Sequence, residues 1–462
     1  MRLLSISALI VLAALAAAQS DPELSNATRS AFEDAQASDS ASWVSQNVTN
    51  DPFYAIPKDG FSAAPGTLLR WQDIPDFQLS SNWTIPAGLS LSRFLFMSQD
   101  RDGNPVPVSG YVLLPYSRIT TAATCNEKEP LKTIVFAHGT AGNIPNCAPS
   151  NQKSLYYGWL APLSLASQGF AVIAPDYAGL GTSIPNGLRY LDGQLHSGDV
   201  AYALIAARAS PIAQLLSHEW LVVGHSEGGM TAWRVNERMA MANQTKVRDA
   251  AGELLGAVSA APPVAGYASQ LTARLLSKTG EPNNPYPFLI FQEISKVFPN
   301  EIKLEDYMTN LALARVPLAN KGCIDTANAL YGDLTTEQIF KNTSWVDLAL
   351  VREWASMAFL VGSYELAAPM LVLAGEADAN TRISLDAAIN TACSKFPKSQ
   401  LLTHTYPRLG HDESFEASKA SMFQWIRDRF NRVPVKEGCS QIKIEPLTQN
   451  YGTRAIDWIG VV

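Results

Sequence analysis

The sequence predicts an α/β protein built on a mostly parallel central sheet, and three observations lead to this prediction. Short runs that are apolar on both faces recur between residues 131 and 406, which is typical of buried parallel strands. Segments with helical periodicity alternate with these runs, as they do in strand–helix–strand units. One run leads directly into a Gly-His-Ser-Glu-Gly tract at residues 224–228, and a helix-compatible segment of small residues follows it.

The expected strands fall into two groups. Antiparallel strands are expected first, with turn signals between them, at 68–71, 90–98 and 108–114. Parallel strands follow at 131–137, 170–174, 221–223, 254–260, 370–374 and 401–406. Helices are expected at 199–209 and 413–430, where apolar side chains recur at helical spacing. The sheet should therefore have antiparallel strands at its N-terminal edge.

A long helical insertion interrupts this alternation. Residues 262–368 hold no convincing strand run, and helices are expected there at 288–298, 304–313, 334–340 and 345–361. Long insertions in such loops tend to be functional, so we expect a cap or lid domain; a purely stabilising insertion is the alternative. The core domain would then comprise 19–261 and 369–434. Within it, 19–66 should form an arm with a helix near 31–44. Residues 435–462 should follow the core as a polar, irregular tail.

The first eighteen residues resemble a secretory signal. Arg2 supplies the positive start, an apolar stretch follows, and three alanines at 16–18 form an A-x-A-like cleavage site. The apolar stretch is short for a membrane anchor, and no later segment predicts a transmembrane helix. Loss of Arg2 changes the formal net charge from −7 to −8. An acidic balance gives no electrostatic reason to bind nucleic acid.

Export agrees with two further features of the sequence. Five Asn-x-Ser/Thr sequons are candidate glycosylation sites, at Asn26, Asn47, Asn82, Asn243 and Asn342. The cysteines are Cys125, Cys147, Cys323, Cys393 and Cys439. In an oxidising compartment they should pair and leave one over, but their spacing does not fix the pairing. Their spacings do not resemble a metal-binding cluster.

The tract at 224–228 predicts a nucleophilic serine, Ser226. In the strand–turn–helix setting a serine sits on a sharp turn with its hydroxyl exposed, and glycines flank it because side chains would crowd the turn. Serine needs a base to remove its proton and an acid to orient that base. In this architecture the chain order is serine, acid, histidine.

Two histidines follow the serine and two acids compete for the remaining role. His404 falls inside an expected strand, whereas His411 lies in the loop before the last helix, so we expect His411 to be the base. The acid should follow the strand at 370–374. Asp378 lies on the loop beyond that strand and is preferred to Glu376, although aspartate is also common as a turn or helix cap.

The serine also needs backbone donors for the oxyanion that forms during attack. One donor should be the N–H of Glu227, the residue after the nucleophile. The second should come from the loop after the strand at 131–137, where the N–H of Thr140 is the candidate, with its hydroxyl as an additional donor. His138 should brace this loop. Tyr177 and the turn at 179–181 should shape the pocket floor; a phosphate-binding loop would need a different context.

Six tracts in this order resemble one known family. They are His-Gly-Thr at 138–140, Asn-Cys-Ala-Pro-Ser at 146–150, Asp-Tyr-Ala-Gly-Leu-Gly at 176–181, Gly-His-Ser-Glu-Gly at 224–228, Gly-Glu-Ala-Asp at 375–378 and Gly-His at 410–411. The chain is similar to the fungal secretory lipases of the yeast lipase A type, which belong to the α/β-hydrolase superfamily. The resemblance implies an α/β-hydrolase fold with a helical cap, hydrolysis of carboxylic esters, and no cofactor or metal.

The resemblance also assigns particular residues. It implies a triad of Ser226, Asp378 and His411, and disulfides Cys147–Cys323 and Cys393–Cys439 with Cys125 left over. Glu227 departs from the uncharged residues often found after the nucleophile, which places a carboxylate near the site.

Three hypotheses about function follow. The first is a secreted serine hydrolase acting on triacylglycerol or similar small-molecule or lipid esters, with transient contact to a lipid interface. The second is an esterase or deacetylase of a fungal secondary metabolite. The third is a catalytically inactive α/β-hydrolase-fold binding protein.

Overall fold

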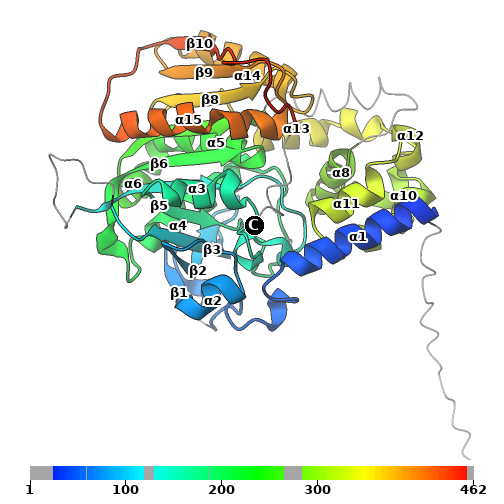
Figure 1. Ribbon diagram of the computed structural model, residues 1–462. Helices are drawn as coiled ribbons and strands as arrows, with labels where there is room; N and C mark the ends of the chain where they lie inside the picture. The colour runs from blue at the N-terminus through cyan, green and yellow to red at the C-terminus, as the bar shows by residue number, and fades with distance from the viewer. Residues whose placement is uncertain (1–23, 59, 119–128, 186, 265–283, 455–462) are drawn as a thin grey trace, which may run out of the picture.

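The computed structural model of the protein describes residues 24–58, 60–118, 129–185, 187–264 and 284–454. The expected signal segment and Cys125 lie outside these ranges. The described strands form one sheet in the order β1-β2-β3-β5-β4-β6-β7-β8-β9-β10 (Figure 1). Their bounds are Leu68–Asp73, Leu89–Gln99, Pro105–Pro115, Leu131–Ala137, Ala171–Pro175, Leu216–His225, Leu254–Ala260, Met370–Gly375, Leu401–Tyr406 and Cys439–Lys443 for β1 to β10.

The sheet changes from antiparallel to parallel at β5. The pairs β1/β2, β2/β3 and β3/β5 are antiparallel, and every later pair from β5/β4 to β9/β10 is parallel. The predicted fold class is therefore confirmed. The serine-bearing strand β6 begins five residues earlier than the apolar run predicts. Its polar start pairs with β4 through a register shift between Leu131 and Thr133, which an apolar pattern does not reveal.

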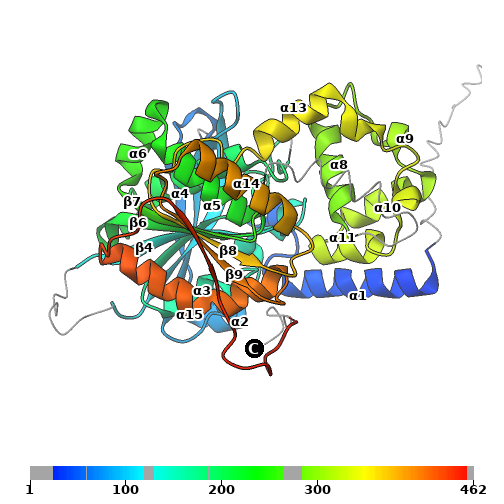
Figure 2. The same cartoon turned by 90° about the horizontal axis from the view of Figure 1, so that it is seen from above.

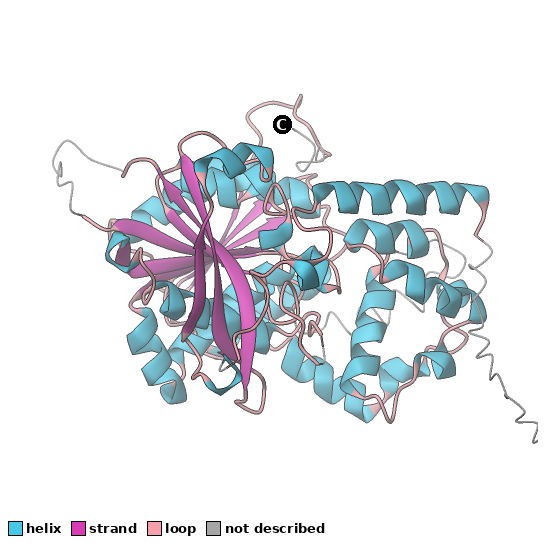
Figure 3. Cartoon of the chain, turned by 90° about the horizontal axis from the view of Figure 1, so that it is seen from below, coloured by secondary structure: helices cyan, strands magenta, loops and turns pink. Residues whose placement is uncertain are grey.

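Alternate side chains of the central strands fill two separate cores, one on each face of the sheet. Val135 and Val222 pack into the core beneath α4 and α5, whereas Ile134 and Leu221 pack into the core beneath α3 and α15. Helices therefore cover both faces (Figures 2 and 3), which explains why these strands are apolar throughout. The helices are α2 Asp76–Ser81, α3 Pro162–Ser167, α4 Gly193–Ala207, α5 Glu227–Ala240, α6 Thr245–Ala251, α14 Arg382–Lys395 and α15 His411–Phe430.

Helices joined by loops make up the described part of the segment between β7 and β8. It lies to one side of the sheet (Figure 2) and contains α8 Tyr286–Val297, α9 Leu304–Tyr307, α10 Asn310–Ala319, α11 Ile324–Tyr331, α12 Thr336–Ile339 and α13 Ala349–Ala358. The predicted helix at 304–313 is two helices. They are separate because the Thr309 side chain caps α10 by accepting from the N–H of Ala312 at 3.2 Å. The sequence analysis missed α11.

The N-terminal arm begins with a long helix that packs on this insertion. Helix α1 spans Asn26–Ser42 and starts earlier than predicted, because Ser25 caps it. A carboxylate oxygen of the buried Asp39 accepts hydrogen bonds at 2.6 Å from the N–H of Cys323 and from the Thr326 hydroxyl, at the start of α11. Figure 2 shows α1 alongside α11. The arm therefore stabilises one end of the insertion.

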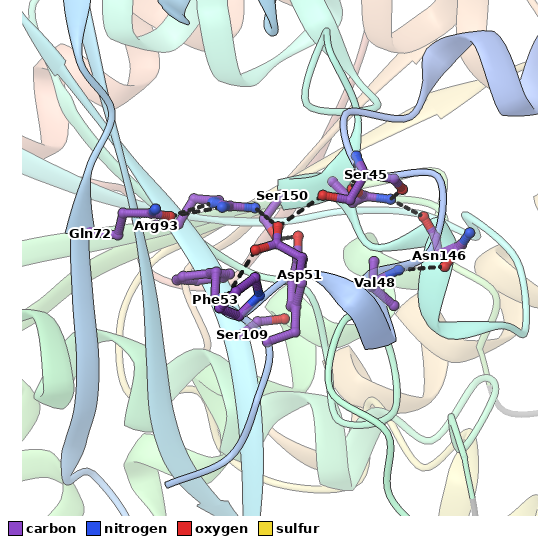
Figure 4. Close-up of polar contacts among 12 residues, drawn as sticks. Ser45, Val48, Asp51, Phe53, Gln72, Arg93, Ser109, Asn146 and Ser150 are labelled. Carbon is purple, nitrogen blue, oxygen red and sulfur yellow. Dashed lines mark hydrogen bonds and ion pairs between the residues drawn. The ribbon is translucent and has the colours of Figure 1, made fainter.

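Beyond α1 the arm is fixed to the core by polar contacts (Figure 4). The N–H of Val48 donates to the Asn146 side chain at 3.1 Å. Asp51 forms an ion pair with the buried Arg93 at 3.1 Å, and the guanidinium of Arg93 lies 4.1 Å from the centre of the Phe53 ring. A buried cation is thus both paired and stacked on an aromatic ring, which offsets its desolvation.

The C-terminal tail contributes an unpredicted edge strand. Residues Cys439–Lys443 form β10, whose side chains are all exposed, and a disulfide joins Cys439 to Cys393 of α14. The second disulfide joins Cys147 to Cys323. These are the two pairings that the family resemblance implies. A polar pattern does not predict β10, because neither of its faces is buried.

Two surface properties bear on the setting of the protein. All five sequon asparagines, at Asn26, Asn47, Asn82, Asn243 and Asn342, are exposed. Among the described residues, none of the helices combines the length and the apolar character needed to cross a membrane.

The position of β10 leads to a prediction about the Cys393–Cys439 disulfide. The double variant Cys393→Ser/Cys439→Ser opens a loop with a sequence separation of 46 residues, so the free energy of unfolding should fall by about 2–4 kcal/mol. Denaturant titration measures this loss. Hydrogen exchange should accelerate most in β10 and at its pairing with β9, with β1 and β2 at the opposite edge as the internal reference. Unchanged exchange in β10 would show that strand pairing alone holds it.

Candidate active site

The candidate nucleophile lies on a strained turn between β6 and α5. Ser226 has φ 56° and ψ −124°, a conformation that costs a non-glycine residue free energy. Its N–H donates to the carbonyl of Ala260, at the end of β7, at 2.9 Å. Surrounding contacts therefore hold the turn, and its side chain remains partly accessible.

The flanking glycines are required by close backbone contacts. A Cβ on Gly224 would lie 2.0 Å from the carbonyl oxygen of Gly228. A Cβ on Gly228 would lie 1.9 Å from the carbonyl oxygen of Ala137, at the end of β4. The start of α5 thus packs directly on the strand backbone, as the sequence analysis expected.

The structure brings the predicted serine, histidine and aspartate into one hydrogen-bonded chain. His411 Nε2 lies 2.9 Å from Ser226 Oγ, and His411 Nδ1 lies 2.9 Å from Asp378 Oδ2. His411 is the first residue of α15, and Asp378 lies three residues beyond β8. This arrangement can move the hydroxyl proton of Ser226 to the imidazole while the carboxylate holds the ring.

The two rival residues lie elsewhere. His404 is buried on β9, away from this chain of contacts. Glu376 lies at the surface, where its carboxylate is 3.5 Å from Lys443 Nζ of β10.

Hydrogen bonds fix the Asp378 carboxylate in its orientation. Oδ1 accepts from the N–H groups of Asn380 and Thr381, at 2.8 and 3.1 Å, and Oδ2 accepts from the Thr381 hydroxyl at 2.6 Å. Burial alone would raise the pKa of Asp378, but the charge and hydrogen bond of His411, with the bonds from Thr381 and Asn380, lower it below its ordinary value. The carboxylate is therefore ionised over the range in which histidine titrates.

The pKa of His411 moves in the opposite direction. Burial alone would lower this pKa, but Asp378 outweighs burial and raises it above the ordinary value of histidine, with smaller contributions from Asp412 and Glu413. Only a neutral imidazole can accept the Ser226 proton, so low pH should inactivate such a pair. The raised pKa places that loss at a higher pH than for an isolated histidine.

The loop after β4 lies directly beside the serine. A Cβ on Gly139 would be 3.1 Å from the Cβ of Ser226. His138 braces the loop, because its Nδ1 lies 2.7 Å from the carbonyl oxygen of Gly139 and its Nε2 lies 3.2 Å from that of Asp176. The hydroxyl of Tyr156 donates to the carbonyl of Thr140. Within the described chain, the N–H of Thr140 makes no hydrogen bond, so it can serve an oxyanion.

The Thr140 hydroxyl, in contrast, does not fit its expected role. It donates to Glu227 Oε2 at 3.2 Å and lies 3.1 Å from the Tyr190 hydroxyl. Its single proton is therefore directed away from the serine. As the first residue of α5, Glu227 has an N–H without an acceptor inside its helix, as expected for its role as an oxyanion donor.

The Glu227 carboxylate is buried behind the turn. Besides the Thr140 hydroxyl, it accepts from the N–H of Leu191 at 2.8 Å and from His196 Nε2 at 3.0 Å. Burial would lower the pKa of His196, but Asp199 and Glu227 raise it to about 10. A charged imidazole thus faces the unexpected carboxylate, and its negative charge is compensated inside the protein.

Tyr177 lies under the loop between two histidine rings. Its ring stacks on His138 at 4.2 Å and on His196 at 4.1 Å, and its hydroxyl donates to the His138 carbonyl. Tyr177 is fully buried and supports the loop from below, and its role in shaping a pocket floor stays a prediction.

Comparison with known proteins agrees with this architecture. Residues 134–420, more than half of the chain, match the profile of the alpha/beta hydrolase family. The chain belongs to this family. Among solved structures, the hydrolase is similar to Candida antarctica lipase A, at 15% identity with a TM-score of 0.68, over 86% of this chain and 90% of that one. It is also similar to the rice cell wall degrading esterase LipA of Xanthomonas oryzae, at 19% identity with a TM-score of 0.60, over 80% and 100% of the two chains.

These likenesses identify a lipase A-like fold. At sequence identities this low, structural similarity is evidence for the fold and not for the activity. Among curated proteins, a Mycobacterium tuberculosis protein named as a probable inactive lipase is 28% identical over 158 residues. That match covers 31% of the hydrolase and 33% of the relative, so it spans about a third of the relative's length.

A cavity of about 490 Å³ lies beside the site in the hydrolase. It is bounded by the β2–β3 turn, the start of α4, and Val297 and Trp354 of the insertion. Ser226, Asp378 and His411 are not among its described lining residues, whereas His196 is. His196 therefore contacts both this cavity and the carboxylate of Glu227.

One group of potential metal ligands occurs among the described residues, His225, His411 and Asp412. Both ring nitrogens of His411 already lie at hydrogen-bonding distance from Ser226 and Asp378. We therefore do not assign this group of three residues as a metal site.

The sequence analysis missed several residues that shape the site. Tyr156 and Tyr157 contact the loop at 138–140, and His196 pairs with Glu227. Tyr156 and Tyr157 lie in irregular chain and His196 inside a helix, none of them within a recognisable motif, so only tertiary contacts reveal their roles.

The opposing effects on the His411 pKa lead to a prediction. In the variant Asp378→Asn burial should dominate, so the pKa of His411 should fall below its wild-type value in an NMR titration of the ring. The variant Asp412→Asn should lower this pKa less, because Asp412 contributes less than Asp378. Equal pKa values in the wild type and Asp378→Asn would contradict the described pairing.

Proposed function

We propose that this protein is a secreted serine carboxylic-ester hydrolase of the lipase type, with Ser226 as nucleophile, His411 as base and Asp378 as the orienting acid. One observation carries the proposal, namely the two contacts of 2.9 Å that link Asp378, His411 and Ser226. A serine on a strained turn with a partnered histidine is the arrangement that acyl transfer requires.

The first half of the reaction forms an acyl-enzyme. His411 Nε2 removes the Ser226 proton as Oγ attacks the ester carbonyl, and the resulting imidazolium is stabilised by Asp378. The N–H groups of Thr140 and Glu227 receive the oxyanion. His411 then gives the proton to the alcohol oxygen, the carbon–oxygen bond of the ester breaks, and the alcohol leaves.

The second half returns the enzyme to its starting state. His411 removes a proton from water, and the hydroxide attacks the acyl carbonyl through the same oxyanion site. The proton returns to Ser226 Oγ as the carboxylic acid leaves. The cycle consumes one ester and one water and needs no cofactor or metal.

The substrate class is proposed to be triacylglycerol or similar acyl esters. The lipase A-like fold and the helical insertion support this class. The likeness to an esterase from Xanthomonas oryzae supports a short-chain esterase or deacetylase as the second candidate. The third hypothesis, an inactive binding protein, receives support from the name of the Mycobacterium tuberculosis relative. The complete Asp378–His411–Ser226 chain favours an active enzyme.

We propose that the insertion at 262–368 is the cap that contacts substrate. Its described part touches the loop at 138–141, called here the oxyanion loop, because the N–H of Ile324 donates to the carbonyl of Ala141 at 3.1 Å. Secretion is supported by the N-terminal sequence pattern, the two disulfides and the exposed sequons.

The serine assignment predicts a strong effect of one substitution. Ser226→Ala should lower kcat for 4-nitrophenyl butyrate by about 10⁵-fold or more, because the nucleophile is lost. The matched control Ser421→Ala, on α15, should stay within about twofold of the wild type, since the hydrogen bonds of Ser421 among the described residues go to Tyr406 and Ser418. Unchanged turnover in Ser226→Ala would refute the assignment.

A chain-length series separates the three hypotheses. With 4-nitrophenyl esters from acetyl to palmitoyl, a lipase should prefer longer chains and gain activity with emulsified triacylglycerol above its solubility limit. A deacetylase should be fastest with acetyl and gain nothing at an oil–water interface. An inactive binding protein would hydrolyse none of these esters.

A further inference from the structure

Two consecutive tyrosines reach the oxyanion loop from an irregular segment. The N–H of Gly139 donates to the hydroxyl oxygen of Tyr157 at 3.1 Å, and the hydroxyl of Tyr156 donates to the next carbonyl, that of Thr140. Leu155 and Tyr156 have φ of 58° and 65°, in the left-handed region that side chains other than glycine rarely adopt. The fold therefore retains a strained segment that places these rings under the loop.

The contact from Tyr157 continues to the histidine that precedes Ser226. The Tyr157 hydroxyl lies 2.8 Å from His225 Nδ1, and His225 Nε2 lies 3.2 Å from the carbonyl oxygen of His411. Three peptide segments that are far apart in sequence are thus joined through two side chains, Tyr157 and His225.

The chemistry of the partners fixes the direction of each bond. The His411 carbonyl can only accept, so the proton of His225 lies on Nε2. In a neutral ring Nδ1 then accepts, and Tyr157 donates to it. Tyr157 in turn accepts from Gly139. Donation therefore runs from Gly139 through Tyr157 and His225 to His411.

Both side chains stay neutral where the enzyme would work. His225 is buried, with its ring 4.9 Å from that of Phe415 and parallel to it within 1°. Burial, and then the neighbouring His411, lower the pKa of His225 to about 3, against smaller opposing effects that include those of Asp378 and Glu413. Asp412 faces the ring with 3.6 Å between its Oδ1 and Nε2. Burial raises the pKa of Tyr157 well above its usual range.

We propose that Tyr157 and His225 are positioning residues that set the oxyanion loop, the Ser226 turn and the His411 main chain relative to one another. Neither touches a reacting atom. The inference rests on the proposed function, in which these three segments supply an oxyanion donor, the nucleophile and the base. A misplacement of about 1 Å in such a site can cost roughly 10²-fold in rate.

The first test removes one hydroxyl. Tyr157→Phe should lower kcat for 4-nitrophenyl butyrate by about 10–100-fold, because the loop is no longer held in position relative to Ser226. The KM should change by less than about threefold, because the contacts that bind substrate remain. Tyr54→Phe is the matched control. It removes a buried tyrosine hydroxyl at 2.8 Å from Ser150 Oγ, the same distance as in the Tyr157–His225 contact, and should leave kcat within about twofold.

The second test asks whether the two side chains act as one unit. His225→Phe keeps a ring against Phe415 but removes the hydrogen bonds to Tyr157 and to the His411 carbonyl. In the double variant His225→Phe/Tyr157→Phe, kcat should fall about as far as in the more impaired single variant. His225→Gln, whose amide can donate to the His411 carbonyl, should retain more kcat than His225→Phe. Thermal unfolding checks that each variant is folded.

Several outcomes would overturn the proposal. They are a kcat within twofold of wild type in folded Tyr157→Phe, an equal loss in Tyr54→Phe, or single losses that multiply in the double variant. Ser226→Ala separates the two levels of inference. If it remains active, the proposed function fails; if it is inactive while Tyr157→Phe is unaffected, the positioning role alone fails.

Discussion

The site depends on one packing constraint. The first turn of α5 lies in direct contact with the main-chain atoms of two strands. Gly228 lies against the end of β4, and Gly229 lies against Ala260 at the end of β7, with no space for a Cβ at either glycine. This contact holds Ser226 in its unfavourable φ and leaves the first N–H groups of α5 beside the hydroxyl. The parallel sheet supplies the rigid surface, so the same contact positions Ser226 and the N–H of Glu227, the proposed nucleophile and oxyanion donor.

A buried pair of charged side chains, Glu227 and His196, completes this arrangement. The carboxylate of Glu227 lies directly behind the serine turn, where an unpaired charge would be costly. His196 faces it, and the N–H of Leu191 and the Thr140 hydroxyl donate to it. The same contacts connect the oxyanion loop, α4 and α5. The residue that departed from the usual pattern is therefore integrated into the structural support of the site.

The sequence predicted the parts of this protein whose signals are local. Apolar runs located the parallel strands, and the glycines, Ser226, Asp378 and His411 were recognisable from their places at strand ends. The rest depends on tertiary contacts. Nothing in the pattern directs the Thr140 hydroxyl toward Glu227, and β10 lacks a buried face. Tyr157 comes from irregular chain, and its contact with His225 appears only after the chain has folded.

The two disulfides divide the chain into covalent rings that do not overlap. One ring closes between Cys147 and Cys323 and contains Ser226, and the other closes between Cys393 and Cys439 and contains His411; Asp378 belongs to neither. The four cysteines that the structure describes could pair in three ways, and this is the sequential one. During synthesis the ring around Ser226 can therefore close before the chain that carries His411 has been made.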